Sequence, residues 1–396
     1  MSAPAAASPP TTPLPRLLWW FALCNFVLGT GAFGLSGYLA PLAQDLDISI
    51  GMAGQTMTAY ALANALLAPL ALLWTRHWPR RRLMLSALGL YSAGALLCTL
   101  APSFAVLMLG RVLMGLGAVF TPVAAGVAVG LVAAAQRGRA LSRTFLGMSL
   151  SYVLGMPLGA WVGLALGWRW PLAVVALLAL GMGWWMSRQL AADVGGEAPP
   201  RLPLRDLLGQ GEVVRALGFT LLYFTAIFTV SAYMGPVQMA LNPLSPTGLS
   251  GVLMCIGLAG VAGTLLGGWS SDRLGPRRTL RTLAGLLLLM MMLLPWTAGW
   301  LLATVLVCGL WSLSGFGMMT PQQARLAEQS FSQAPMLMSL NASMVYIGTA
   351  LGAVVGGWAL PHTGFAQLPW VGAGFAALAW ASLWWRPPAR AASRTP

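Results

Sequence analysis

Arg111 is a charged side chain placed well inside an apolar run, in the segment 104–130. Seven residues into its helix, it would lie roughly 10 Å deep at about 1.5 Å per residue. An arginine at the centre of a bilayer costs about 2.5–3.5 kcal/mol on insertion scales, so its presence there is by default a hypothesis of function. Two interpretations stay open: Arg111 takes part in proton chemistry, or its guanidinium donates to backbone carbonyls and fixes helix packing.

Carboxylates are the other groups that could carry a proton, and the chain has only 8 acidic residues. All of them fall near or beyond the ends of apolar runs: Asp45, Asp47, Asp193, Glu197, Asp206, Glu212, Asp272 and Glu328. Asp45 and Asp47 are expected at the mouth of the first two apolar segments, where they form a shallow proton site or else end one helix and cap the next. A proton-coupled process would therefore use a peripheral acid, and an uncoupled process is the alternative.

Isolated polar and aromatic residues on apolar segments are candidates for lining a binding cavity between two groups of helices. These candidates are Asn25, Tyr60, Asn64, Tyr152, Tyr223, Tyr233, Gln322, Asn341 and Tyr346. A buried Tyr or Asn is equally often a helix–helix hydrogen bond, so we expect about half of them to face the cavity. None is charged, which favours a neutral or amphiphilic ligand.

The sequence does not favour metal binding, enzymatic catalysis or ATP-driven transport. The four cysteines lie in apolar segments without metal-ligand spacing, so no metal site and no cofactor are expected. The apolar segments lack the convergent His, Asp, Glu or Ser of an embedded enzyme. A Walker loop needs a lysine, and the chain contains none, so ATP drive through such a loop is excluded. A non-transporting membrane receptor or scaffold remains a weaker alternative.

The elements that must position these residues are membrane helices. Hydrophobic residues make up 58% of 396 and charged residues 8%, which is typical of a polytopic membrane protein in contact with the lipid bilayer. The predicted spans are 17–40, 51–74, 83–101, 104–130, 141–166, 169–187, 215–240, 248–270, 279–295, 299–321, 336–360 and 366–385. The domains are a disordered tail at 1–15, a six-helix bundle at 16–187, a linker at 188–214, a second bundle at 215–385 and a tail at 386–396.

Charge sets the predicted orientation. The net charge is +14, and all the positively charged side chains counted in it are arginines. With both termini in the cytoplasm, every arginine except Arg111 and Arg169 falls on the cytoplasmic side, as the positive-inside rule requires. The basic balance is therefore topological, and no nucleic-acid partner is expected.

Two related halves are visible in the sequence. The stretch from Gly268 to Arg278 repeats a weaker copy from Ala71 to Arg81, and a glycine ladder recurs: Gly155, Gly159 and Gly163 correspond to Gly348, Gly352 and Gly356. Such small-residue ladders let helices approach closely, and Pro157 is expected to kink one of them. This layout is typical of a transporter built from parallel repeats.

From Leu39 to Trp385 these motifs resemble the major facilitator superfamily, specifically its twelve-span drug:proton antiporters and their sugar-efflux and arabinose-exporter-like branch. The residues that carry the resemblance are the 268–278 loop, the run Arg111 to Ala118, Gly155-Met-Pro157-Leu-Gly159, Gly167 to Trp170, Gln322, Asn341 and the 348–357 glycines. The resemblance implies an all-α membrane protein with the major facilitator fold, twelve transmembrane helices in two pseudo-symmetric six-helix bundles.

The resemblance also implies residue roles. A conformational gate would be formed by Gly268, Asp272, Arg273, Gly275, Arg277 and Arg278. Arg76 and Arg80 belong to the diverged copy of this loop in the first half, in which Thr75 replaces the aspartate. Arg111, Asp45 and Asp47 are the candidates for proton coupling. The expected function is export of a small neutral or amphiphilic solute, a sugar or a drug, by alternating access across a bacterial-type inner membrane, with protons as counter-ion and the protein as a monomer. The alternative is a uniporter or exchanger.

Overall fold

The structure is a computed structural model, which describes residues 15–75, 77–133, 136–190, 209–329 and 333–384. The predicted tails and most of the predicted linker lie outside these ranges, as does Arg76. Eleven helical segments among the described residues are long and apolar enough to cross a membrane. The last of them, α18 (Ala334–Ser382), contains two helices because Gly364 has a φ of 68° and a ψ of 176°. Division at Gly364 gives the twelve predicted spans.

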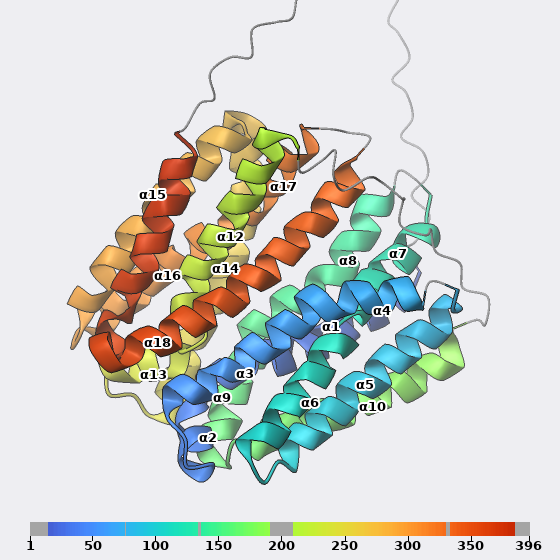
Figure 1. The fold of residues 1–396 in the computed structure, drawn as a ribbon, viewed down its shortest axis with the longest axis horizontal. Helices are drawn as coiled ribbons and strands as arrows, with labels where there is room; N and C mark the ends of the chain where they lie inside the picture. Colours follow the sequence, from blue (N-terminus) through green and yellow to red (C-terminus); the bar gives the residue numbers. More distant parts are fainter. Residues whose placement is uncertain (1–14, 76, 134–135, 191–208, 330–332, 385–396) are drawn as a thin grey trace, which may run out of the picture.

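The first half of the chain builds one group of mutually packed helices (Figure 1). Its helices are α1 (Leu17–Phe33), α2 (Leu39–Asp45), α3 (Ile50–Leu62), α4 (Ala68–Trp74), α5 (Arg80–Thr99), α6 (Phe104–Gly117), α7 (Phe120–Gly130), α8 (Arg137–Leu150), α9 (Met156–Ala165) and α10 (Arg169–Gln189). Within this half α1 packs on α8 and α10, and α5 packs on α6 and α10.

The second half repeats the pattern with α12 (Gly211–Ser231), α13 (Met234–Leu241), α14 (Pro246–Leu274), α15 (Pro276–Leu293), α16 (Leu301–Gly317), α17 (Met319–Ala327) and α18. Here α12 packs along α18, and α14 packs on α16. Large apolar side chains are exposed on the outside, among them Trp358 at 73% and Leu265 at 71%. Water would penalise such surfaces, whereas lipid solvates them.

The first helix of each half is broken at the same point. The predicted span 17–40 is not continuous, because α1 gives way to a 3₁₀ segment (Gly34–Gly37) before α2. Likewise, the predicted span 215–240 breaks between α12 and α13. Tyr38 (φ −133°, ψ 37°) and Tyr233 (φ −119°, ψ 25°) occupy matching backbone conformations at these breaks.

The glycine ladders pack against these broken helices. A Cβ on Gly163 would lie 2.5 Å from the Tyr38 ring, and a Cβ on Gly356 would lie 2.6 Å from the Tyr233 ring. Real Cβ atoms essentially never approach other atoms so closely, so each tyrosine ring requires the glycine opposite it. The two halves therefore pack in the same way: α9 lies against the break that follows α1, and α18 lies against the break that follows α12.

The two halves contact each other mainly toward one end of the molecule. The contacting pairs include α3 and the Ala63–Leu67 segment with α18, α9 and the Ser151–Gly155 segment with α14, and α13 with α2 and with the Gly34–Gly37 segment. In Figure 1, α3 and α18 run side by side, while α2, α9 and α13 gather at the edge opposite the one where the described residues begin and end, which we call the end of the termini. The end opposite the termini is therefore the closed end.

Candidate functional site

The closed end is held by hydrogen bonds that cross between the halves. On α3, Gln55 Nε2 donates to the carbonyl of Ala353 at 3.1 Å and to Tyr233 Oη at 3.3 Å. The Tyr233 hydroxyl lies 2.8 Å from the Ala353 carbonyl and 3.2 Å from the Gly51 carbonyl. Gly54 faces the Tyr233 ring so closely that any side chain there would overlap it. This contact contains no ion pair among the residues described.

Further contacts extend this closure. Thr58 Oγ1 lies 3.4 Å from the Ala350 carbonyl, and Ser250 Oγ donates to the Pro157 carbonyl at 3.0 Å. Gly257 on α14 meets the backbone carbonyl of Tyr152 so closely that a Cβ would clash with it. Gln55 and Thr58 were not among the sequence-predicted residues. Their signal was available, since they are isolated polar residues on the same helix as Tyr60 and Asn64.

An aromatic chain crosses from one half to the other beside this closure. The ring of Phe33 stacks on Tyr152 at 4.9 Å, and Tyr152 makes an edge contact with Phe316 at 4.9 Å. Phe33 also approaches Phe228 at 6.1 Å, and the chain continues through Phe224 to Tyr223. The three phenylalanines Phe33, Phe228 and Phe316 were missed by the sequence analysis, because an apolar ring on an apolar helix carries no distinguishing signal.

Three predicted tyrosines meet near this chain. The hydroxyls of Tyr60, Tyr152 and Tyr346 are close enough to interact electrostatically, and Tyr346 comes from the second half. None of the three hydroxyls has a hydrogen-bond partner within the described residues. A phenol in an apolar setting normally finds a partner, so the described residues leave the bonding capacity of these hydroxyls unused.

Two of the predicted residues lie on π-helical segments. Asn64 belongs to the π-helix Ala63–Leu67, and Tyr152 belongs to the π-helix Ser151–Gly155, which directly precedes Pro157. Such segments occur frequently at functional sites, because the extra residue redirects neighbouring side chains. The predicted kink at Pro157 is thus accompanied by a wider turn on its N-terminal side.

The remaining polar candidates form hydrogen bonds with partners inside their own half. Asn25 donates to the Thr144 carbonyl at 2.9 Å and accepts from Thr121 at 2.6 Å. Gln322 donates to the Ala216 carbonyl and to Thr220, and Thr220 donates to Asn341 at 2.7 Å. These three residues join helices within a half. Tyr223 lies buried at the end of the aromatic chain, and Tyr233 belongs to the closure.

Arg111 is fully buried and bonded to backbone carbonyls. Its Nη1 donates to Gly31 at 2.7 Å, its Nη2 to Ala32 at 2.8 Å and its Nε to Thr56 at 3.1 Å. Gly31 and Ala32 end α1, where the last carbonyls lack partners from their own helix and the helix dipole is negative. The geometry matches the packing interpretation of Arg111. The arginine stabilises the break in α1 that the sequence did not predict.

The two outer aspartates match the expected helix end but not the expected cap. Asp45 is the last residue of α2 and pairs with Arg169 at 2.5 Å. The Arg169 guanidinium holds the pKa of the Asp45 carboxyl below its usual range. The expectation that these aspartates cap the next helix is wrong: the Ser49 hydroxyl accepts from the Met52 amide and caps α3. Asp47 lies in the intervening turn with a φ of 50°.

The predicted gate loop joins α14 to α15. Gly275 has a φ of 82°, the conformation that the tight turn requires. Asp272 is exposed and unpaired within the described residues, Arg273 stacks on Trp269 at 4.6 Å, and Arg277 lies 3.7 Å from Glu212. Gly268 faces Thr320, Arg278 is exposed, and Arg80 begins α5. No His, Cys, Asp and Glu grouping among the described residues could hold a metal ion.

Two pseudo-symmetric helix groups, with an uncharged aromatic interface between them, define a membrane transporter. The family model described as "Major Facilitator Superfamily" matches residues 21–345. The chain therefore belongs to the Major Facilitator Superfamily, whose members of this type are membrane transporters and not enzymes.

Several curated proteins are similar to this chain over most of its length. The chain is 30% identical over 363 residues to the inner membrane transport protein YdhP of Escherichia coli, covering 90% of this chain and 92% of that protein. It is 27% identical to a probable sugar efflux transporter of Pasteurella multocida, with coverages of 90% and 88%. It is 29% identical to a chloramphenicol resistance protein of Streptomyces lividans, with coverages of 89% and 90%.

A solved structure shares the fold. A bacterial homologue of the human lysosomal transporter Spinster, in an inward-facing and unoccupied conformation, superposes with a TM-score of 0.80 at 14% identity. The match covers 94% of this chain and 97% of that chain. The multi-pass membrane location and the twelve-helix fold predicted from the sequence are thereby confirmed.

Proposed function

We propose that this chain exports a small neutral or amphiphilic solute, a sugar or a drug, by alternating access in exchange for protons. The observation that carries the proposal is the position of Tyr60, Tyr152 and Tyr346 within electrostatic range of one another across the two halves, beside the ring of Phe33 and with their hydroxyls unpartnered among the described residues. Phenol groups among aromatic rings suit a ligand that has both polar and apolar parts. The names of the two relatives, a sugar efflux transporter and a chloramphenicol resistance protein, support the outward direction.

The conformation also supports alternating access. Hydrogen bonds across the halves lie at the end opposite the termini, and α4, α8 and α17 make few or no contacts across the halves at the other end. With the termini in the cytoplasm this state would be closed to the outside and open inward. The arginines near the termini support that orientation by the positive-inside rule, and the relative YdhP is named an inner membrane protein. The working unit proposed is a monomer.

A uniporter or exchanger is the second candidate, and the Asp45–Arg169 pair favours it. A carboxylate paired with a guanidinium keeps its charge at neutral pH, so Asp45 is poorly suited to take up and release a proton. Asp47 is left as the other outer acid.

Proteoliposomes containing a pH-sensitive dye separate the two candidates. The experiment imposes a proton gradient, adds chloramphenicol or a neutral sugar, and records both solute and proton movement. Solute movement accompanied by solute-dependent proton flux supports antiport. Solute movement without proton flux supports the uniporter or exchanger, and binding without any solute movement contradicts both.

A further inference from the structure

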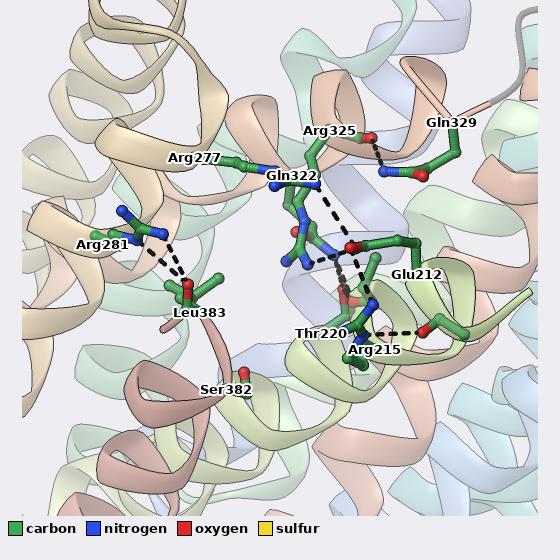
Figure 2. A network of polar contacts seen from close by, with 12 residues as sticks. Glu212, Arg215, Thr220, Arg277, Arg281, Gln322, Arg325, Gln329, Ser382 and Leu383 are labelled. Carbon is green, nitrogen blue, oxygen red and sulfur yellow. Dashed lines mark hydrogen bonds and ion pairs between the residues drawn. The ribbon is translucent and has the colours of Figure 1, made fainter. Parts of the chain in front are cut away.

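A group of charged side chains lies on the second half, at the end of the termini. It comprises Glu212 and Arg215 at the start of α12, Arg277 at the start of α15 and Arg325 at the end of α17. We call these four residues the arginine cluster. Figure 2 shows their side chains converging from the three helices. It plays no part in the aromatic interface described above.

Arg325 is the unexplained member of the cluster. Its side chain is 7% exposed, and its Nε and Nη1 atoms are buried without any hydrogen-bond partner in the described residues. The nearest anionic atom is Glu212 Oε2, at 3.8 Å from Nη2, which is too long for a hydrogen bond. A guanidinium is always charged and has five donors. Leaving such a group buried and unbonded is costly, so a missing partner is indicated.

The charge of the cluster identifies the kind of partner. Three arginines face one carboxylate, and Glu212 Oε1 is already engaged by Arg215 at 2.9 Å. Arg277 reaches Glu212 Oε2 only at 3.7 Å. Arg277 and Arg325 therefore direct donors toward a common space that lacks a close acceptor. A tetrahedral oxyanion with several acceptor oxygens matches two such guanidinium groups, as in arginine–phosphate pairs.

The depth of the cluster suits a membrane headgroup. Two arginine–tryptophan stacks flank it on the same half, Arg273 over Trp269 at 4.6 Å and Arg281 over Trp384 at 4.7 Å. Arg281 also donates to the Leu383 carbonyl, as Figure 2 shows. Tryptophan and arginine of this kind gather where acyl chains meet headgroups. The Arg277 side chain is 58% exposed, so the outer edge of the cluster is open to a lipid phosphate or a dissolved phosphate.

We propose that Arg325, together with Arg277 and Arg215, binds a phosphate-type oxyanion, either the headgroup of an anionic lipid or inorganic phosphate. Glu212 orients the arginines and leaves the cluster with a surplus of positive charge. The site is separate from the solute path, so its occupancy is expected to stabilise the second half without competing with the transported solute.

The test measures the thermal unfolding of the full-length protein in phosphatidylcholine nanodiscs. One arm adds inorganic phosphate against sodium chloride of matched ionic strength, and the other replaces part of the phosphatidylcholine with phosphatidylglycerol. A ligand that binds only the folded state raises the melting temperature with the logarithm of its concentration. For Arg325→Met, we expect the apparent affinity for the anion to fall about tenfold or more, the loss typical of a charge-assisted hydrogen bond.

Controls keep the result interpretable. Arg277→Gln removes a half-exposed member and tests the site if Arg325→Met fails to fold. Arg278→Gln removes the same charge from the adjacent exposed position, and it should keep the wild-type response. A response in both arms supports the site, a response in only the lipid arm assigns it to a headgroup, and a response in only the phosphate arm assigns it to the free anion. No response in either arm, or an equal loss in Arg278→Gln, overturns the proposal.

Discussion

Gln55 of the first half donates a hydrogen bond to the Tyr233 hydroxyl of the second half at 3.3 Å. Tyr233 stands at the break between α12 and α13, and its ring fills the space left by Gly54 and Gly356. The residue that ends one broken helix therefore also joins the two halves. Since these bonds are neutral and few, the closed end can open at a modest energetic cost.

Tyr233→Phe should weaken the closed end. It removes a hydroxyl that contacts Gly51, Gln55 and Ala353 but keeps the ring that packs on the glycines. A net hydrogen bond contributes about 0.5–1.5 kcal/mol, so the ratio of closed to open molecules should fall about two- to tenfold. Pulsed electron paramagnetic resonance between spin labels on the two halves measures that ratio.

Tyr223→Phe is the matched control for this experiment. Tyr223 lies on α12, the helix that precedes Tyr233, and its hydroxyl makes no hydrogen bond within the described residues. An unchanged distance distribution for Tyr233→Phe, or an equal shift for Tyr223→Phe, would contradict the assigned role of Tyr233.

Gly257→Ala should separate the halves at the contact between α14 and Tyr152. The new methyl group would clash with the Tyr152 carbonyl, whereas Gly251 on the same helix has nothing within 4 Å. Gly251→Ala should instead stabilise the protein slightly, by up to about 1 kcal/mol from helix propensity. Spin-label distances and melting temperatures of the two variants provide the comparison. Equal behaviour of the two would refute the close approach.

Arg111→Gln should lower the stability of the fold and leave proton movement nearly unchanged. The change removes donors from the Gly31, Ala32 and Thr56 carbonyls, and each bond to a charged donor contributes about 1.5–3 kcal/mol. A large fall in melting temperature, with near-normal solute-dependent proton flux per folded molecule, is the expected result. Loss of proton flux in a variant of normal stability would instead favour a coupling role.

The pH response of Asp45 follows from its partner. Because Arg169 lowers the pKa of Asp45 in the folded state, the pair contributes stability above the ordinary carboxyl pKa and loses it as pH falls through the lowered value. The side chains are 45% and 39% exposed, so the contribution is small, about 0–1 kcal/mol. Asp45→Asn should leave the pH dependence of transport near neutrality unchanged, as measured by solute flux. A shifted pH profile would make Asp45 a proton carrier.

The sequence predicted the spans because apolar length and arginine distribution dominate membrane insertion. It also located the glycine ladders, whose period needs no tertiary information. It did not predict the breaks near Tyr38 and Tyr233, because these depend on a distant partner: Arg111 supplies donors to the carbonyls that end α1. The π-helices at Asn64 and Tyr152 were likewise invisible, since no residue type marks them.

The candidate site was predictable in part, because a polar residue on an apolar helix stands out in the sequence. Isolated tyrosines on apolar helices indicated Tyr60, Tyr152 and Tyr346 as candidates, and the structure places them within electrostatic range of one another. Asn25, Gln322 and Asn341 gave the same signal, yet each forms a side-chain hydrogen bond with a neighbour within its own half. Sequence shows that a polar group needs a partner but does not say whether the partner is protein or ligand.

Counterflow of chloramphenicol in proteoliposomes tests the central claim most directly, with wild-type protein compared with Tyr346→Phe and Tyr91→Phe. Tyr346 has an unpartnered hydroxyl at the interface, whereas the Tyr91 hydroxyl donates to the Leu28 carbonyl within the first half. We expect the wild-type protein to exchange chloramphenicol. The apparent affinity should be about three- to tenfold weaker in Tyr346→Phe and unchanged in Tyr91→Phe. Exchange of chloramphenicol with equal affinity in all three proteins would contradict the proposed site.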